Sequence, residues 1–368
     1  MKNLLHTLSP ERYFFTEYEA CHRDFMSKVK TLSALHPQCE SFLQGEINTT
    51  KLLTEAIWLG PEDAKKVLVI ISGTHGVEGY CGSAIQRLLL DQLQQQQLPI
   101  GDNTALLFIH ALNPWGMYWA RRCDQDGIDL NRNFIDFSAR PDPDTDYPEL
   151  LAALSEVDAS KRNSQLSKLR NLWGQTRYDE VLSGGQYHQP WAPFYGGTQP
   201  ASANRVIEQI IQRWSLASRE LIVLDLHTGL GPFGHGELIS DHPANSPSDH
   251  YSRCIYGDAI ANTELGDSFS VPKAGLMDYR WHQLMAQKGC YLTLEFGTLG
   301  TQALFDVLFS ESLYWRDQQP KSINDSQYKH LRLAMINHFC PADPLWRQTA
   351  LFKGWQAVQR ALDYFNEK

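Results

Sequence analysis

Four short apolar runs, separated by stretches with helical spacing, constrain the fold of this chain more than any other feature. They span residues 67–71, 105–109, 221–226 and 291–294, and β-branched and other apolar side chains fill most of their positions. A continuous apolar run of this length is typical of a strand that is buried on both faces of a parallel sheet. Such strands, alternating with helices, predict an α/β fold with a mainly parallel sheet.

Side chains that can carry chemistry stand where these predicted strands end. His75 follows the first run after a short glycine-containing turn, Asn113 follows the second, His227 ends the third and Glu295 ends the fourth. Ligands of open α/β sheets bind beyond the carboxyl ends of the strands. We therefore expect these residues to share one site.

The rest of the chain is divided by its periodicity and its turn residues. We predict a helix within 11–35, two short strands within 41–60, and a helix over 82–93. Residues 138–200 look like an insertion that could border the site, and 323–368 look helical.

The predicted domain organisation follows from these segments. Residues 1–60 form a helix and a hairpin of the same domain, 61–310 form the catalytic domain with the insertion at 138–200, and 311–368 form a helical C-terminal extension.

Composition excludes several classes of function. The 368 residues carry a formal net charge of -9, which disfavours a basic face for nucleic acid. The seven cysteines are scattered without a CxxC pair, which disfavours a disulfide framework and a cysteine-rich zinc site. Neither a signal peptide nor an apolar run of the ~18 residues that a membrane helix needs is present. We expect a cytoplasmic protein without membrane or nucleic-acid partners, and the sequence leaves its oligomeric state open.

His75 and Glu78 are the first candidate metal ligands. Their spacing can place both side chains on one side of a helical turn, although about one His-x-x-Glu arises by chance in a chain like this. The position after a buried strand, and His227 as a third ligand, favour the set of two histidines and one glutamate found in catalytic zinc sites. We expect one Zn²⁺ per chain.

A polar segment after the second strand offers groups that bind anions. It contains Arg121 and Arg122, and then Asp129-Leu130-Asn131-Arg132-Asn133. Asparagine beside arginine supplies several hydrogen-bond donors, which suits a carboxylate. An arginine near the metal could stabilise an oxyanion, whereas the arginines alone fit a surface turn rich in salt bridges better.

Taken in order, these motifs resemble the zinc carboxypeptidase superfamily, the carboxypeptidase A-like metallopeptidases. The shared pattern over residues 67–300 is His-x-x-Glu, Asn-Pro-x-Gly, Arg, Asp-x-Asn-Arg-Asn-aromatic, a strand ending in His and a strand ending in Glu. The chain looks closest to a bacterial branch of unassigned substrate. The resemblance implies an α/β fold with a mixed, mainly parallel sheet of about eight strands between helices.

The resemblance also implies roles for the matching residues. His75, Glu78 and His227 would bind zinc, with Asp129 accepting a hydrogen bond from His75. Glu295 would activate the attacking water, and Arg122 rather than Arg121 would polarise the scissile carbonyl. Asn131 and Arg132 would hold a free carboxylate of the substrate.

Two departures from the family pattern leave the substrate class open. Val77 stands where digestive carboxypeptidases have arginine, and the related deacylases favour His-Gly-Asn-Glu over the His-Gly-Val-Glu found here. The alternatives are a metallocarboxypeptidase, an N-acyl amino acid deacylase similar to aspartoacylase or succinylglutamate desuccinylase, and a non-catalytic carboxylate-binding protein. Either enzyme would act on a small peptide or acylated amino acid with a free carboxylate.

Five further residues have both a functional and a structural interpretation. Tyr279 and Tyr195 are candidates for the mobile tyrosine of the family, or core residues. His235 and His242 could bind a second metal or substrate, or lie in a solvated loop. Cys81 could be a nucleophile near a helix start, although packing explains a small residue there better.

Overall fold

The described residues of the computed structural model, 9–266, 268–271 and 273–367, form an eight-stranded sheet in the order β1-β2-β4-β3-β5-β8-β6-β7. Its strands are β1 (Gln38–Ile47), β2 (Thr50–Leu59), β3 (Lys66–Ser72), β4 (Thr104–His110), β5 (Glu220–Gly229), β6 (Gly236–Ser240), β7 (Ile260–Asn262) and β8 (Gly289–Gly297). The sheet is mixed, since β1, β2 and β6 each have an antiparallel neighbour. The predicted α/β class with a mixed sheet is confirmed.

The centre of the sheet consists of four parallel strands, β4, β3, β5 and β8. They are the four apolar runs of the sequence. The predicted pair of strands before them is the hairpin of β1 and β2, in which Ile47 lies opposite Thr50. Both hairpin strands have ten residues and are longer than predicted.

Alternating side chains of the central strands enter two separate cores. In β3, Leu68 and Ile70 belong to one buried cluster, whereas Val67, Val69 and Ile71 belong to the other. Successive side chains of a strand point to opposite faces, so a continuous apolar run requires helices on both sides.

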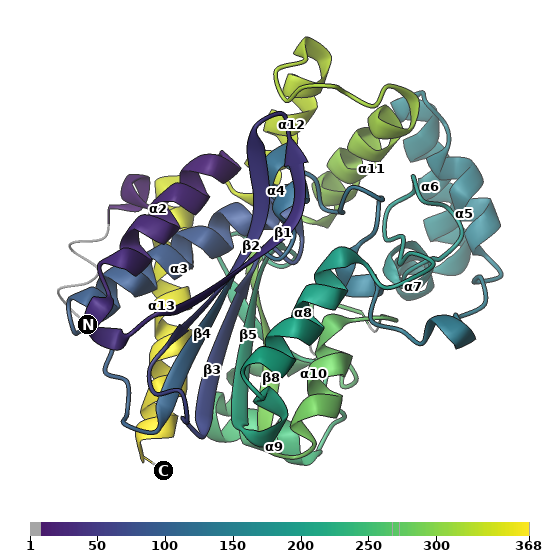
Figure 1. Cartoon of the computed structure of the whole chain (residues 1–368). Helices are drawn as coiled ribbons and strands as arrows, with labels where there is room; N and C mark the ends of the chain where they lie inside the picture. Colours follow the sequence, from purple (N-terminus) through teal and green to yellow (C-terminus); the bar gives the residue numbers. More distant parts are fainter. Residues whose placement is uncertain (1–8, 267, 272, 368) are drawn as a thin grey trace.

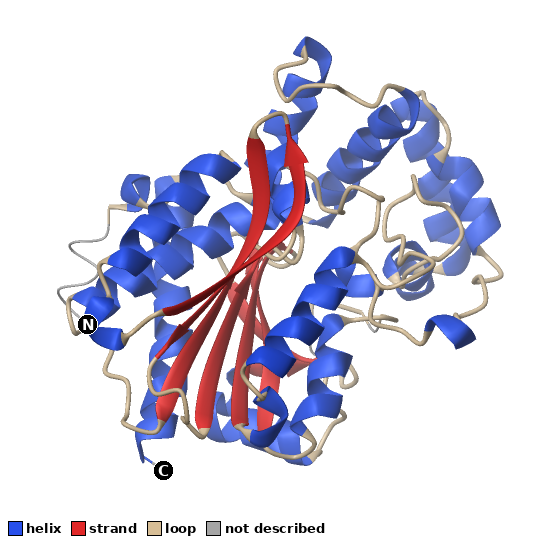
Figure 2. Cartoon of the chain, in the orientation of Figure 1, coloured by secondary structure: helices blue, strands red, loops and turns tan. Residues whose placement is uncertain are grey.

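Helices cover both faces of the sheet (Figures 1 and 2). The first cluster includes apolar side chains of α2 (Tyr18–Lys30), α3 (Gly79–Gln94), α9 (Pro247–Tyr256) and α13 (Pro344–Glu367). Two helices contribute to the second cluster, α8 (Ser202–Arg213) and α10 (Met277–Met285). The predicted helix over 11–35 is shorter than expected, because only α2 is α-helical there.

The insertion at 138–200 contains helices and lies beside α11 (Figure 1). Phe194 of this segment packs edge-on against Phe305 of α11, with ring centroids 6.3 Å apart. The remaining helices are α4 (Pro114–Trp119), α5 (Tyr147–Leu154), α6 (Ala159–Trp173), α7 (Gln175–Ser183), α11 (Thr301–Asp317) and α12 (Ser326–Phe339). The helical tail is therefore present as predicted, in α12 and α13.

The strand order reverses at β3 and β5. From β3 the chain passes through α3 to β4 on one side, and from β5 it proceeds toward β8 on the other. A crevice opens beyond the carboxyl ends of the strands at such a switch point. His75 follows β3, and His227 lies near the carboxyl end of β5.

The strands β6 and β7, which the sequence did not predict, lie at one edge of the sheet. The segment around His235 and His242 was expected to be a solvated loop, but it contains β6, and His242 is buried. The strand was missed because Gly236–Ser240 is short and has a charged residue, Glu237, at its second position.

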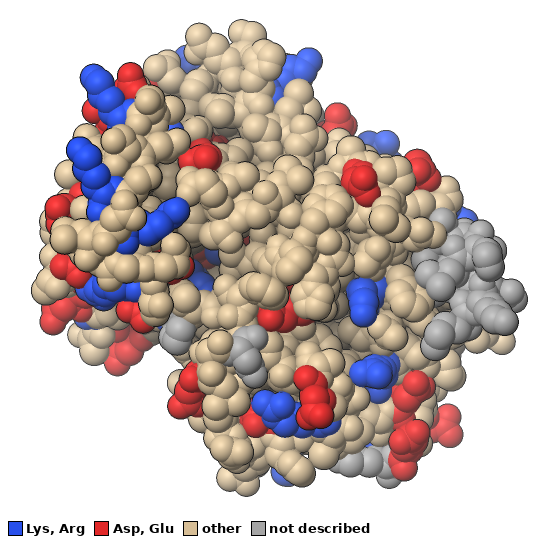
Figure 3. Space-filling model, turned by 180° about the vertical axis from the view of Figure 1, so that it is seen from behind, with Lys and Arg blue, Asp and Glu red and all other residues tan. Residues whose placement is uncertain are grey.

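The surface carries both signs of charge. On the face shown in Figure 3, Lys and Arg lie among Asp and Glu around largely uncharged surface. None of the described helices combines the length and the apolar character that crossing a bilayer requires.

Candidate metal centre

The turn after β3 is pressed against the start of α4. Its backbone N–H groups at Gly76 and Val77 donate to the carbonyl oxygens of Arg122 (3.2 Å) and Arg121 (2.9 Å). A Cβ atom at Gly76 would lie 2.1 Å from the carbonyl carbon of Gly116, so only glycine allows this approach. The contact fixes the arginine pair beside the His-x-x-Glu motif.

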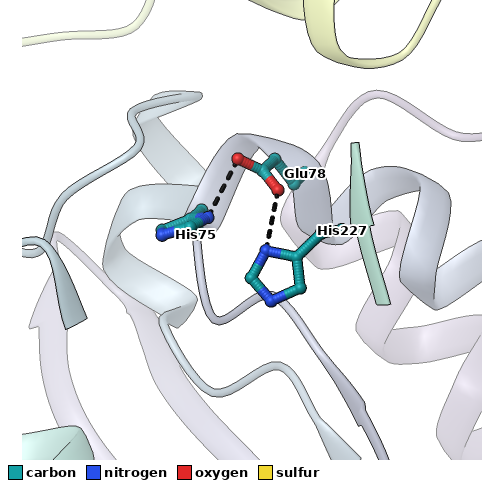
Figure 4. Close-up of side chains that lie close together, drawn as sticks. All are labelled: His75, Glu78 and His227. Atoms are coloured by element: carbon teal, nitrogen blue, oxygen red, sulfur yellow. Dashed lines mark ion pairs between the residues drawn. The ribbon is translucent and has the colours of Figure 1, made fainter. Parts of the chain in front are cut away.

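Three buried side chains meet at this turn (Figure 4). Nδ1 of His75 lies 3.0 Å from one carboxylate oxygen of Glu78, and Nδ1 of His227 lies 3.3 Å from the other. The three potential ligand atoms lie within 4.8 Å of one another. Among the described residues, this is the group that meets the geometry of a metal site.

A carboxylate orients each of the two imidazoles from behind. Nε2 of His75 lies 3.0 Å from Asp129, and Nε2 of His227 lies 2.6 Å from Asp225. A carboxylate accepts only, so each Nε2 carries a proton, and each Nδ1, which faces Glu78, is the nitrogen that would bind a metal.

Asp225 was missed by the sequence analysis. It is fully buried and also accepts hydrogen bonds from the hydroxyls of Thr74 (2.8 Å) and Tyr291 (2.8 Å). It precedes His227 by two residues in β5, and residues two apart share one face of a strand. That spacing could have identified it as the partner of His227.

The donor set fits a zinc ion. Two imidazole nitrogens and one carboxylate match a catalytic site that keeps a position open. The Nδ1 atom of His75 is buried and makes no hydrogen bond, although a carboxylate oxygen lies 3.0 Å away. A metal ion would satisfy this buried nitrogen, which binds it in the unprotonated form.

Burial and the surrounding charges shift the pKa values of Glu78 and Glu295 in opposite directions. Burial alone would raise the pKa of Glu78, but His75, His227 and Arg122 outweigh burial and lower it. Burial, and next the charge of Glu78, raise the pKa of Glu295 to about 7. The two carboxyl groups therefore differ in proton affinity at neutral pH.

Glu295 lies beside His227 because their strands run in register. The two residues are partners on the parallel strands β5 and β8, and Glu295 accepts a hydrogen bond from the backbone N–H of Leu230 (2.9 Å). It lines the same pocket as the three candidate ligands, which holds about 510 Å³ of empty space with its open mouth included.

Arg122 connects the ligands to the insertion. Its Nε donates to Asp129 (2.9 Å), and one terminal nitrogen donates to Glu78 (3.0 Å). Its guanidinium lies over the ring of Phe194, 5.3 Å from the centroid. Because Phe194 belongs to residues 138–200, this segment borders the site.

A family model matches residues 14–353 of the sequence, under the description "Protein of unknown function (DUF2817)". The chain belongs to this family. No curated protein matches the sequence at a significant level.

Solved structures similar to this DUF2817 chain include two kinds of hydrolase. A metallo-carboxypeptidase from Burkholderia cenocepacia is 13% identical, with 94% of this chain and 68% of that one covered and a TM-score of 0.45. Carboxypeptidase A from Helicoverpa armigera is 13% identical, with 96% of this chain and 74% of that one covered and a TM-score of 0.48. The succinylglutamate desuccinylase from Chromobacterium violaceum is 14% identical, with 87% of this chain and 75% of that one covered and a TM-score of 0.39. These findings agree with the resemblance seen in the sequence.

Asn131 and Arg132 line the pocket of this DUF2817 chain, although neither is wholly free. Oδ1 of Asn131 accepts from the backbone N–H of Met277 (2.8 Å), which directs its NH₂ group away from that contact. Arg132 is buried and donates to the carbonyl oxygens of Ser183 (2.7 Å) and Asn131 (2.6 Å). Both side chains keep unused N–H groups.

The remaining candidates do not line this pocket. Arg121 pairs with Glu311, and the Tyr279 hydroxyl donates to the backbone oxygen of Lys273 (2.9 Å). Tyr195 is buried in the second core cluster. Burial, its largest cause, raises the pKa of the Cys81 thiol well above its usual value, so the packing interpretation fits that residue.

Proposed function

We propose that this protein is a zinc-dependent hydrolase of a peptide or amide bond next to a free carboxylate. The observation that supports it is the convergence of His75, Glu78 and His227, with each imidazole held through Nε2 by a carboxylate. These three residues would hold one Zn²⁺ per chain. When bound, the ion would act as a Lewis acid and lower the pKa of a bound water to about 7.

Glu295 is the proposed general base. It lies in the pocket without belonging to the ligand set, and its pKa of about 7 suits proton transfer at neutral pH. It would take a proton from the attacking water and return it to the leaving nitrogen.

The pocket arginines and Asn131 supply the remaining roles in this proposal. Arg122 would stabilise the negative charge on the carbonyl oxygen in the transition state, through the N–H groups that Asp129 and Glu78 do not use. Asn131 and Arg132 would bind the carboxylate next to the scissile bond through their unused N–H groups.

The test is turnover by the Glu295→Gln variant, which keeps the shape of the side chain and removes its basicity. The zinc-loaded protein would first be screened against dipeptides and N-acyl amino acids, which also separates a peptidase from a deacylase. We expect the variant to fold and retain zinc but to lose at least ~10²-fold in kcat. Glu149→Gln, on an exposed residue of α5, is the matched control. A stable, zinc-bound Glu295→Gln enzyme with normal turnover would contradict the proposal.

A further inference from the structure

Two cations in the wall of the pocket have no carboxylate partner among the residues that the structure describes. Arg132 donates to the carbonyl oxygens of Ser183 and Asn131, and Lys273 donates to the hydroxyl of Ser270 and to the carbonyl oxygen of Val271 (2.9 Å). Among the described residues, no carboxylate oxygen lies within 4.0 Å of either cation. Neutral oxygens therefore solvate both charges.

The backbone fixes Lys273 relative to Arg132. The N–H of Ala274 donates to Gly184 (3.1 Å), and the N–H of Phe134 donates to Gly275 (3.1 Å). Gly275 has a φ of +72°, and a Cβ atom there would lie 2.3 Å from the carbonyl oxygen of Arg132. The segment that carries Lys273 thus crosses closely over the backbone of Arg132.

The charge around Lys273 favours an incoming anion. Burial, and next the charge of Arg132, lower the pKa of Lys273 to about 8. Asp241 lines the same pocket and partly offsets this repulsion, but its Oδ1 accepts from the Thr263 hydroxyl (2.5 Å) and it forms no ion pair with Lys273. Arg132 is buried and Lys273 is half-buried. Charges with little access to water are costly unless they are paired, so a ligand that brings two anionic groups fits this wall best.

We propose that Lys273 binds a second carboxylate of the substrate, so that the amino acid released by hydrolysis is acidic. This inference rests on the proposed function, in which Asn131 and Arg132 bind the first carboxylate. The substrate class is then a peptide or N-acyl derivative of an amino acid with a side-chain carboxylate. Lys273 acts as a specificity-determining residue and takes no part in bond cleavage.

The kinetic test compares substrates that differ only in the released amino acid. Zinc-loaded protein would be assayed with paired glutamate and glutamine derivatives, and with lysine and leucine derivatives. We expect kcat/KM to be about 10- to 100-fold higher for glutamate than for glutamine. Lys273→Met should abolish this preference, mainly through a higher KM for the glutamate substrate. Lys273→Arg should retain the preference, and Lys329→Met, on an exposed residue of α12, should leave it unchanged.

A binding measurement separates this inference from the proposed function. Calorimetry on the zinc-loaded Glu295→Gln protein would compare N-acetylglutamate with N-acetylglutamine. If no substrate is hydrolysed, the proposed function fails, but tighter binding of N-acetylglutamate that Lys273→Met removes still supports the role of Lys273. Equal use and equal binding of the two compounds would overturn the inference. A preference for the lysine derivative would also overturn it and would assign the subsite to Asp241.

Discussion

At the scale of single residues, Asp225 is the group on which the geometry of His227 depends most. Replacing it by asparagine keeps the volume but removes the carboxylate that fixes the imidazole tautomer. We expect Asp225→Asn to weaken zinc binding by about 10- to 100-fold, the usual effect of losing such a partner. Competition with a chromogenic chelator would measure the change.

Tyr291→Phe is the matched control for this prediction. It removes one hydrogen bond to the Asp225 carboxylate and leaves the contact of that carboxylate with His227 intact. Its zinc affinity should fall less than that of Asp225→Asn. Equal affinities of Asp225→Asn and the wild type would show that the strand alone orients His227.

The predicted ligands were accessible from the sequence because each stands at the end of an apolar run, and parallel strands end at one edge of the sheet. The place of Lys273 in the pocket could not be predicted, because no sequence pattern links its loop to the strand ends. The hydrogen bonds of Ala274 and Gly275 to distant backbone hold it in the pocket. A contact between loops that are far apart in the sequence has no periodicity by which to predict it.

At the scale of elements, the site depends on the contact between the turn after β3 and the start of α4. Gly76→Ala would place a methyl group 2.1 Å from backbone that cannot move as a side chain would. We expect a loss of stability of about 1–3 kcal/mol or more, together with weaker zinc binding, since the turn carries two of the three ligands. Denaturant unfolding with and without zinc would measure both effects.

Gly101→Ala is a suitable control for this variant. The atom closest to a Cβ there is the end of the exposed Asn366 side chain, which can swing aside. If Gly76→Ala proved as stable and as rich in zinc as Gly101→Ala, the turn would be more pliable than its contacts indicate.

His242, which follows β6, should make the folded protein less stable in acid. His242 accepts a hydrogen bond at Nε2 from the backbone N–H of Tyr291 (3.0 Å), and its ring stacks on His282, with centroids 3.5 Å apart. Burial lowers the pKa of His242 to about 4, and the charge of Asp249 opposes this shift without reversing it. Because the unfolded state binds the proton more tightly, this contribution to stability is present above about pH 6.5 and is lost as the pH falls toward 4.

The effect of His242 should be of the order of 1–3 kcal/mol at pH 4. His242→Gln can still accept the hydrogen bond but does not titrate, so its unfolding free energy should decline less than that of the wild type between pH 6.5 and 4. Parallel curves for the two proteins would contradict the assignment.

The central elements were predictable and the peripheral ones were not, for a physical reason. Strands buried on both faces need continuous apolar runs, which is why β3, β4, β5 and β8 are evident in the sequence. β7 has three residues, and β6 has five with a glutamate among them, so the neighbouring strand rather than the local sequence determines their conformation.

At the scale of the whole molecule, the first core cluster joins distant parts of the chain. It includes Phe25 of α2, Ile85 of α3 and Leu362 of α13, all fully buried. The division at residues 310 and 311 stays a prediction, but a shared core of this kind indicates that both parts unfold together.

Zinc should therefore stabilise the entire chain and not the catalytic segment alone. The ligands come from the turn after β3 and from β5, at the middle of the sheet, so binding would oppose every unfolding event that separates these strands. At a free zinc concentration 1,000-fold above Kd, the stabilisation is about 4 kcal/mol, which should raise Tm by several degrees. We expect one calorimetric transition in the chelator-treated protein and one, at higher temperature, in the zinc-loaded protein. The His75→Ala variant should show a single transition that zinc does not shift. A second transition that zinc leaves in place, and that disappears when residues 311–368 are removed, would instead establish the C-terminal helices as an independent unit.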